Sequence, residues 1–257
     1  MDLELQNKRV IVTGSSRGIG EAIARGFLNE GAKVCITSRG PKQLLETEKK
    51  LVKEFGRDQV SSILCDCSDP IELDKLKNTI VSQWGGLDIL VTNVGDGRSV
   101  EDALPSEVQW EKVWKINFES TLNSVRAFLS LIQDSKGCIL FISSIAGMES
   151  IGAPVDYSTA KTAIIALAKN LSKKLSKDVR VNVLSPGNIW FPGGSWDEKI
   201  KLDSESVNSL IKSSVPMNRF GTPDEVSDAA VFLCSKRASF ITGSVMAIDG
   251  GQTVGIF

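Results

Sequence analysis

The sequence predicts an α/β protein: a doubly wound sheet of seven parallel strands with helices on both faces. Short apolar runs alternate with longer helical patterns along the 257 residues, which is typical of consecutive β-α-β units. Several runs are apolar throughout, as expected for strands covered on both faces. No repeat or linker divides the chain. We therefore expect a single domain over residues 1–257.

The elements follow in a regular order. The expected strands are Arg9–Thr13, Lys33–Thr37, Gln59–Leu64, Leu87–Thr92, Cys138–Ser143, Val179–Leu184 and Val245–Ile248. The expected helices are Gly20–Asn29, Lys42–Phe55, Ile71–Trp84, Trp110–Ile132, Tyr157–Ser176 and Pro223–Leu233. Asn188–Ser214 breaks the rhythm after the sixth strand. We expect a substrate-loop insertion there, because ligands bind at the carboxyl ends of the strands and long loops at that edge are often functional.

The composition excludes several classes of function. The net charge of −1, from 30 basic and 31 acidic residues, predicts no binding to nucleic acid or to an anionic membrane. The chain has no apolar run of about 18 residues and no apolar signal core before the first strand, so a cytoplasmic protein is expected. The five cysteines are scattered without C-x-x-C spacing, which favours small buried side chains over disulfides.

Histidine is absent from the chain. Catalytic triads or dyads that need histidine are therefore excluded, and so are histidine-based zinc sites. No metal site is expected. Proton transfer near neutral pH must use a different side chain.

The first strand leads directly into the turn T-G-S-S-R-G-I-G over residues 13–20, and a helix follows. Glycine permits a tight turn and a close approach of the backbone to a pyrophosphate. The free N–H groups at the helix N-terminus bind such an anion. This position at the first βα junction predicts a dinucleotide site, where the glycines alone would be weak evidence.

The end of the second strand indicates which dinucleotide is bound. An acidic residue there would bind the ribose 2′-hydroxyl of NAD, but this chain has Ser38 followed by Arg39. Arg39 can pair with a 2′-phosphate, and Arg17 in the glycine turn can add a second guanidinium. The sequence therefore predicts NADP(H) rather than NAD(H).

Tyr157 and Lys161 lie four residues apart in a helical pattern and so share one face. Tyr157 is the only tyrosine of the chain. A free phenol has a pKa of about 10, and we expect the nearby ammonium to lower the pKa of Tyr157. The pair is thus predicted to act as a general acid/base.

These motifs together resemble the short-chain dehydrogenase/reductase family, over essentially the whole chain. They are G-x-x-x-G-x-G from Gly14, Asp66, Asn93-Val94-Gly95, Asn117, Ser144, Tyr157-Ser158-Thr159-Ala160-Lys161, Pro186-Gly187 and Asp249-Gly250-Gly251. Each could occur by chance, but their order and spacing are specific. The resemblance implies a Rossmann fold and a hydride transfer between a nicotinamide and a carbonyl or secondary alcohol. Overall, the chain is most similar to 3-oxoacyl-carrier-protein reductases.

The resemblance also implies a role for each site residue. Tyr157 donates the proton, Ser144 holds the substrate oxygen with Ser143 as its rival, Lys161 binds the nicotinamide ribose, and Asn117 supports a water-mediated proton relay. The implied cofactor-binding residues are Gly14, Ser16, Arg17, Gly18, Ile19, Gly20, Ser38, Arg39, Asp66, Cys67, Asn93, Val94, Gly95, Tyr157, Lys161, Pro186, Gly187 and Ile189. Family members are commonly homotetramers, so a tetramer or dimer is expected.

The chain departs from the family pattern around the presumed cleft. Val94 replaces the usual alanine, and no threonine follows Pro186-Gly187. The aromatic residues Trp190, Phe191 and Trp196 could form a substrate wall or only stabilise their own loop. Arg98 could bind an anionic substrate or lie in solvent. The substrate thus stays open between a 3-oxoacyl thioester and a polar, sugar-like ketone, and a catalytically silent NADP(H)-binding sensor is the alternative of another class.

Overall fold

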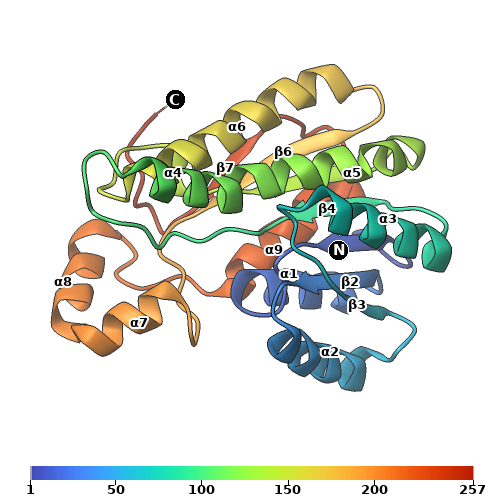
Figure 1. The fold of residues 1–257 in the computed structure, drawn as a ribbon, viewed down its shortest axis with the longest axis horizontal. Coiled ribbons are helices and arrows are strands. Elements are labelled where there is room, and N and C mark those ends of the chain that lie inside the picture. The colour runs from blue at the N-terminus through green and yellow to red at the C-terminus, as the bar shows by residue number, and fades with distance from the viewer. Residues whose placement is uncertain (1, 257) are drawn as a thin grey trace.

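A computed structural model describes residues 2–256 of the chain and contains one parallel sheet of seven strands in the order β3-β2-β1-β4-β5-β6-β7 (Figure 1). The strands are β1 (Arg9–Val12), β2 (Lys33–Ser38), β3 (Val60–Leu64), β4 (Ile89–Thr92), β5 (Cys138–Ile142), β6 (Arg180–Pro186) and β7 (Val245–Ile248). The predicted fold class is confirmed, and each strand lies within a few residues of its expected position.

Helices connect consecutive strands. They are α1 (Gly18–Asn29), α2 (Pro41–Phe55), α3 (Pro70–Trp84), α4 (Glu107–Trp114), α5 (Ser120–Asp134), α6 (Val155–Leu175), α7 (Ser195–Leu202), α8 (Ser204–Ser214) and α9 (Pro223–Cys234). Short helical turns occur at Lys115–Glu119, Ile145–Gly147 and Lys236–Ala238. The first of these is a π-helical turn that joins α4 to α5, so the expected Trp110–Ile132 helix is a longer run with one widened turn.

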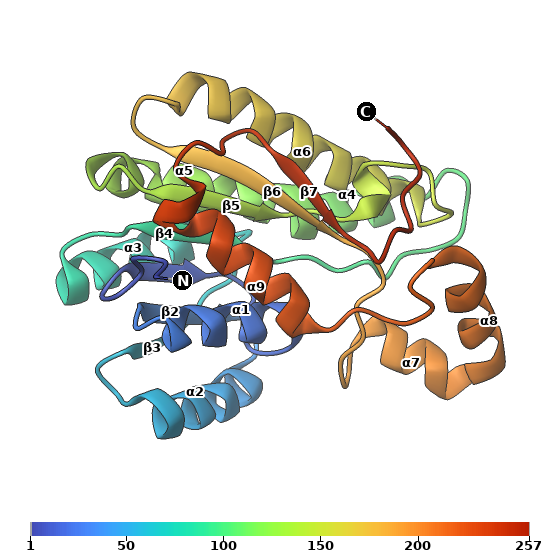
Figure 2. The same ribbon diagram turned by 180° about the vertical axis from the view of Figure 1, so that it is seen from behind.

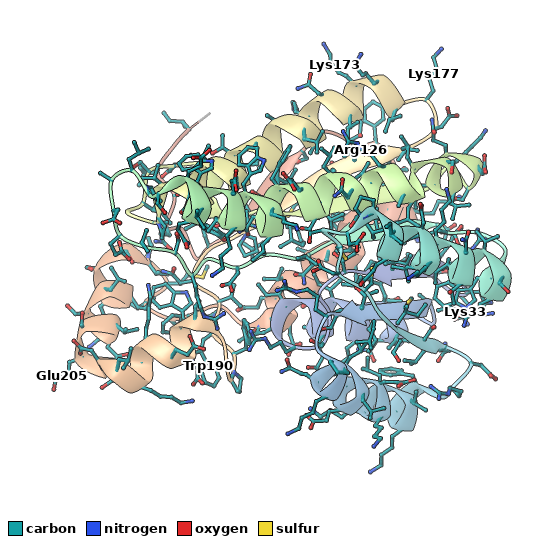
Figure 3. The ribbon with its side chains drawn as sticks, viewed as in Figure 1. Lys33, Arg126, Lys173, Lys177, Trp190 and Glu205 are labelled. Carbon is teal, nitrogen blue, oxygen red and sulfur yellow. The ribbon has the colours of Figure 1, made fainter. Side chains whose placement is uncertain are left out.

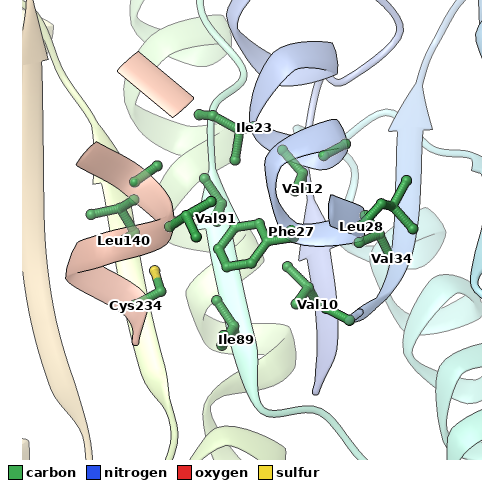
Figure 4. Close-up of a cluster of buried hydrophobic side chains, with 14 of the residues drawn as sticks. Val10, Val12, Ile23, Phe27, Leu28, Val34, Ile89, Val91, Leu140 and Cys234 are labelled. Atoms are coloured by element: carbon green, nitrogen blue, oxygen red, sulfur yellow. The ribbon is translucent and has the colours of Figure 1, made fainter. Parts of the chain in front are cut away.

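Successive residues of a strand face opposite sides of the sheet, and this explains why the strands are apolar throughout. In β1, Val10 and Val12 pack into one core layer while Ile11 packs into the other. Helices α1, α2 and α9 cover the first face, and α3, α5 and α6 cover the second (Figure 2). Figure 4 shows the Phe27 ring of α1 among valines of β1 and β4.

The segment Asn188–Ser214 is not the irregular loop that the sequence suggested, because most of it forms α7 and α8. The Asp203 side chain accepts a hydrogen bond from the Ser206 N–H (3.0 Å) and so caps α8. Val207 and Ile211, four residues apart, bury one face of that helix. The two helices extend beyond the sheet at the carboxyl ends of its strands (Figure 1).

The five cysteines are free and buried, as expected from their spacing. They are Cys35, Cys65, Cys67, Cys138 and Cys234. Among the helices described, none is both long and apolar enough to cross a bilayer.

Candidate active site

A cleft of about 440 Å³ opens at the carboxyl ends of β1 and β4. Strand order reverses direction between these neighbours, and ligands of open α/β sheets bind at such a point. The predicted cofactor residues that line the cleft are Gly14, Ser16, Arg17, Ile19, Gly20, Ser38, Arg39, Asp66, Cys67, Asn93, Val94, Gly95, Tyr157 and Lys161. The structure therefore gathers most of that set around one space.

The glycine-rich turn needs its glycines for two different reasons. Gly14 and Gly18 have φ values of +62° and +57°, a region that side chains rarely adopt. Gly20 is needed for close packing, since a Cβ there would lie 2.5 Å from both the Asn93 Nδ2 and the Gly14 oxygen. Asn93 Nδ2 donates to that same Gly14 oxygen (2.9 Å), which fastens the end of β4 to the turn.

The end of β2 presents polar and cationic groups to the cleft. The Ser16 hydroxyl donates to the Ser38 hydroxyl oxygen (3.1 Å), and the Gly40 N–H donates to that oxygen as well (3.1 Å). The Arg39 guanidinium is 60% exposed and stands 3.9 Å from the Asp66 carboxylate. Helix α2 begins just beyond, so its positive N-terminal end adds to this electropositive corner.

Asp66 lies on the opposite wall of this corner. Burial alone would raise the pKa of the Asp66 carboxyl group, but hydrogen bonds from the backbone and hydroxyl of Ser68 outweigh it and hold the pKa below its ordinary value. The group is therefore an anionic acceptor with a fixed orientation.

Four of the predicted cofactor residues do not line the cleft: Gly18, Pro186, Gly187 and Ile189. The Gly187 N–H donates to the carbonyl oxygen of Ile248 in β7 (3.0 Å). Ile189 lines a separate cavity, which Ile248 and Asp249 also line. Gly18 is covered by Phe191, whose ring would lie 2.6 Å from a Cβ at that glycine.

Phe191 is a lining residue that the sequence reasoning left out of the cofactor set. The aromatic character of the segment was its only signal. Arg17 Nη1 donates to the Gly193 carbonyl oxygen (2.7 Å), so the segment before α7 is bound down onto the glycine turn. Trp196 instead packs on Phe220, with ring centroids 5.4 Å apart, and Trp190 is 39% exposed (Figure 3).

Tyr157 and Lys161 lie on the first turns of α6, with the ammonium 5.7 Å from the centre of the phenol ring. The expected lowering of the tyrosine pKa by Lys161 is wrong in this structure. Burial raises the pKa of Tyr157; Ser144, hydrogen-bonded to the phenol, opposes that rise, and the negative charge of Asp96 adds to it. The phenol therefore holds its proton at neutral pH.

The Lys161 side chain is only 3% exposed. Its ammonium group donates to the Ile142 carbonyl oxygen at the end of β5 (3.1 Å) rather than to the phenol. Burial lowers the pKa of Lys161 to about 8.

The two candidate serines have different environments. The Ser143 hydroxyl donates to the Lys161 carbonyl oxygen (2.8 Å) and so anchors α6 to β5. Ser144 Oγ instead accepts the Ala146 N–H (3.1 Å) and lies close enough to the phenol of Tyr157 to oppose the rise of its pKa. Ser144 is thus the serine that faces the tyrosine hydroxyl.

Asn117 is fully buried in the π-helical turn. Its Nδ2 donates to the carbonyl oxygens of Val113 (3.0 Å) and Asp96 (3.1 Å), and its Oδ1 accepts the Asp96 N–H (3.1 Å). A Cβ at Gly95 would lie 2.9 Å from Lys161 Nζ and 3.0 Å from Asn117 Oδ1. The asparagine therefore fixes the backbone that follows β4 directly beside the lysine.

A nucleotide-sized cleft that ends at a tyrosine beside a buried lysine defines a dinucleotide-dependent oxidoreductase. A family model described as "Enoyl-(Acyl carrier protein) reductase" matches residues 14–253. The chain belongs to the short-chain dehydrogenase/reductase family, whose nicotinamide-dependent hydride transfer it shares.

Individual relatives cover nearly the whole chain. A 3-oxoacyl-[acyl-carrier-protein] reductase FabG of Aquifex aeolicus is 33% identical over 98% of this chain and 100% of its own length. A tropinone reductase homolog of Arabidopsis thaliana is 36% identical over 98% and 94%. The crystal structure of L-sorbose reductase from Gluconobacter frateurii, complexed with NADPH and L-sorbose, has a TM-score of 0.93 and 30% identity and covers 100% of both chains.

Proposed function

We propose that the chain is an NADP(H)-dependent carbonyl reductase in which Tyr157 is the proton donor. The observation that carries this proposal is the protonated phenol beside Ser144 at one end of the cleft, with Ser38 and Arg39 at the other. A phenol that holds its proton at neutral pH can give that proton to a carbonyl oxygen as a general acid, which is the reductive direction.

The choice of NADP(H) follows from the charges at the end of β2. Ser38 offers a hydroxyl and Gly40 an N–H group, and Arg39 is exposed over the same corner. A guanidinium binds phosphate oxygens in a fork, whereas no carboxylate of β2 stands where it would bind a ribose 2′-hydroxyl. Arg17, on the glycine turn, adds positive charge to the cleft.

The chain's own residues have distinct tasks in the reaction. Bound NADPH would supply the hydride. Ser144 would hold the substrate oxygen by a hydrogen bond, and Tyr157 would deliver the proton to that oxygen. Lys161, fixed on the Ile142 carbonyl, would place a positive charge beside the nicotinamide ribose. Asn117 would hold the Asp96 backbone in place at the edge of this site.

For the substrate we propose first a 3-oxoacyl thioester, because several relatives are named 3-oxoacyl-[acyl-carrier-protein] reductases. A second candidate is a neutral polar ketone such as a keto sugar, and the charges at the mouth of the cleft favour it. Arg98 is bound by both Asp96 (3.1 Å) and Glu198 (2.9 Å), so one positive and two negative side chains stand there. Such a mouth does not attract an anionic substrate.

The test is oxidation of NADPH and NADH followed at about 340 nm with acetoacetyl thioesters, small ketones and keto sugars. Tyr157→Phe should lower kcat by about 100-fold or more, a typical loss for a general acid, while NADPH binding measured by fluorescence stays unchanged. Tight NADPH binding without turnover on any carbonyl would leave a sensor as the better description. The best substrate of the panel decides between thioester and sugar.

We further propose that the chain acts as a single cytoplasmic domain that assembles into a tetramer or dimer. Leu104 and Val108, next to and on α4, are 79% and 77% exposed, and Phe240 is fully exposed. Exposed large apolar side chains support self-association. Sedimentation equilibrium of the purified chain measures the oligomer directly.

A further inference from the structure

Asp156, the residue before Tyr157, is a buried carboxylate that the proposed reaction does not use. Its side chain is 1% exposed, and no lysine or arginine of residues 2–256 forms an ion pair with it. A buried charge without hydrogen bonds is strongly destabilising. A carboxylate kept in such a place therefore needs an explanation from its partners.

Two hydrogen-bond donors and a helix N-terminus hold this carboxylate. The Tyr157 N–H donates to Oδ1 (2.7 Å), and the Ser99 hydroxyl donates to Oδ2 (2.5 Å). Asp156 also lies in the first turn of α6, where the helix dipole stabilises negative charge. Ser99 in turn accepts a hydrogen bond from Gln109 Nε2 of α4 (3.0 Å).

The direction of this chain of bonds is fixed. Gln109 donates to Ser99, so the single hydroxyl proton of Ser99 is free to go to Asp156. An amide at position 156 would replace one acceptor oxygen by an N–H donor. That N–H would face either the Ser99 hydroxyl, whose proton would lose its acceptor, or the Tyr157 N–H, which would lose its own.

The hydrogen bonds of Ser99 matter because Ser99 is the last residue of a segment that lies beside Tyr157. Asp96, Gly97 and Arg98 line the cleft next to the tyrosine, and together with Ser99, which follows them, they make up what we call the Asp96–Ser99 wall. Asn117 binds the Asp96 backbone at the near end, and Asp156 binds Ser99 at the far end. Between them, the Gly97 backbone faces the phenol, since a Cβ there would lie 3.6 Å from Cζ of Tyr157.

We propose that Asp156 is a positioning residue that holds the Asp96–Ser99 wall against Tyr157 through Ser99, and so sets how the carbonyl substrate is bound. The inference rests on the proposed function for its kinetic test. The wall carries Asp96 and Arg98 after the end of β4, whereas Ser38 and Arg39 lie at the end of β2. Loosening it should therefore affect the substrate far more than the adenosine end of the cofactor.

The experiment compares Asp156→Asn with Asp224→Asn in the full chain. Asp224 is the matched control, because it occupies the second position of α9 as Asp156 does in α6 but is exposed. Asp156→Asn should raise the KM of the carbonyl substrate about tenfold, the effect of losing one buried hydrogen bond, with kcat lowered less and the dissociation constant of NADPH within about twofold. Asp224→Asn should change none of these. An unaltered KM in Asp156→Asn overturns the proposal.

A second pair of variants tests the connection through Ser99. Ser99→Ala should raise the KM of the carbonyl substrate as Asp156→Asn does, whereas Ser99→Thr, which keeps the hydroxyl, should have the KM of the wild-type chain. The double variant Ser99→Ala/Asp156→Asn should have a KM no higher than that of Asp156→Asn alone. Additive losses in the double variant would overturn the connection. These variants also serve if Asp156→Asn does not fold.

Hydrogen exchange keeps the inference separate from the proposed function. The amides of Asp96 and Arg98, bonded to Asn117 Oδ1 and to Asp96 Oδ1, should exchange faster in Asp156→Asn and not in Asp224→Asn. This result needs no turnover. Faster exchange in an enzyme inactive on every carbonyl would retain the positioning role and refute the reductase, whereas unchanged exchange would refute the positioning role.

Discussion

The buried ammonium group of Lys161 destabilises the fold, and the cost depends on pH in a definite direction. Burial lowers the pKa of Lys161 from 10.5 to about 8. Between these two values the unfolded chain binds more protons than the folded chain, so the free energy of unfolding rises with pH through this window. Below about pH 8 the full cost of burying the charge is present.

Replacing Lys161 by methionine should therefore stabilise the protein while abolishing turnover. We expect Lys161→Met to raise the free energy of unfolding at pH 7 by about 1–3 kcal/mol, a gain that disappears above about pH 10. Urea unfolding at several pH values measures it. Lys173→Met, an exposed position on the same helix (Figure 3), should show no such pH-dependent gain. A less stable Lys161→Met variant at pH 7 would show that the bond to Ile142 outweighs burial.

Arg39 is the residue on which the cofactor preference can be tested. Arg39→Ala should weaken NADPH binding by about 10- to 100-fold, because a charge-assisted hydrogen bond contributes about 1.5–3 kcal/mol. NADH has no 2′-phosphate, so its affinity should not change. Fluorescence titration with both nucleotides decides the matter, and equal losses for the two would show that Arg39 does not bind the 2′-phosphate.

At the scale of elements, the run from α4 to α5 shows what the sequence could and could not predict. The pattern predicted its helical character, and the family resemblance implied a role for Asn117. The π-helical turn was not predicted, because its asparagine bonds to the Asp96 backbone, 21 residues away in the sequence. A helix pattern carries no information about such a distant partner.

The α7–α8 pair is held over the cleft by polar contacts from two sides. Arg98 forms a two-point ion pair with Glu198 of α7, and Arg17 binds the Gly193 carbonyl oxygen. Exposed ion pairs contribute less than about 1 kcal/mol to global stability. We therefore expect these contacts to stabilise the local position of residues 188–214 over the cleft rather than the fold as a whole.

Glu198→Gln should leave the unfolding midpoint nearly unchanged but speed proteolytic cleavage within residues 188–214. Glu205→Gln on the outer side of α8 is the control, since Glu205 forms no ion pair among the described residues (Figure 3). Limited proteolysis followed by mass spectrometry gives the cleavage rates. Equal rates in the two variants would mean that Phe191 packing alone closes the segment.

At the scale of the whole molecule, we expect the free energy of unfolding to fall in acid because of the Asp88–Arg9 ion pair at the amino ends of β4 and β1. Burial alone would raise the pKa of Asp88, but the Arg9 guanidinium and backbone N–H lower it below its ordinary value. The stabilisation is present above the unfolded pKa of about 3.9 and is lost as pH falls through the lower folded value.

Removing that charge should make the protein less stable and less sensitive to acid. Asp88→Asn is expected to lose about 1–3 kcal/mol at pH 7, and its unfolding free energy should fall less steeply below about pH 4. Chemical unfolding at a series of acidic pH values tests this, with the exposed Asp178→Asn as control. Parallel pH curves for Asp88→Asn and the wild-type chain would assign the acid sensitivity to other carboxylates.

The whole fold was more predictable than the site. The fold class and the positions of the strands follow from the alternation of apolar runs with helical patterns and from the glycine turn, which are local signals that the sequence carries. The site depends on side-chain directions: Lys161 turns to Ile142 rather than to the phenol, and Ile189 points into another cavity. Phe191 lines the cleft because the segment before α7 is bound to the glycine turn through Arg17. The mixed charges of residues 188–214 gave no clear helical pattern from which α7 and α8 could be predicted.

The five buried thiols can report on local opening of the structure. They are distributed over β2, the end of β3, β5 and α9, and none is more than 5% exposed. A thiol reagent can therefore react only when the surrounding structure opens, so the labelling rate of each cysteine measures a local opening free energy without any engineered probe. Cys65 and Cys67 line the nucleotide cleft. Their protection by a bound nucleotide would record occupancy of the cleft, while Cys138 and Cys234 record the loosening of the opposite, uninvolved end of the sheet.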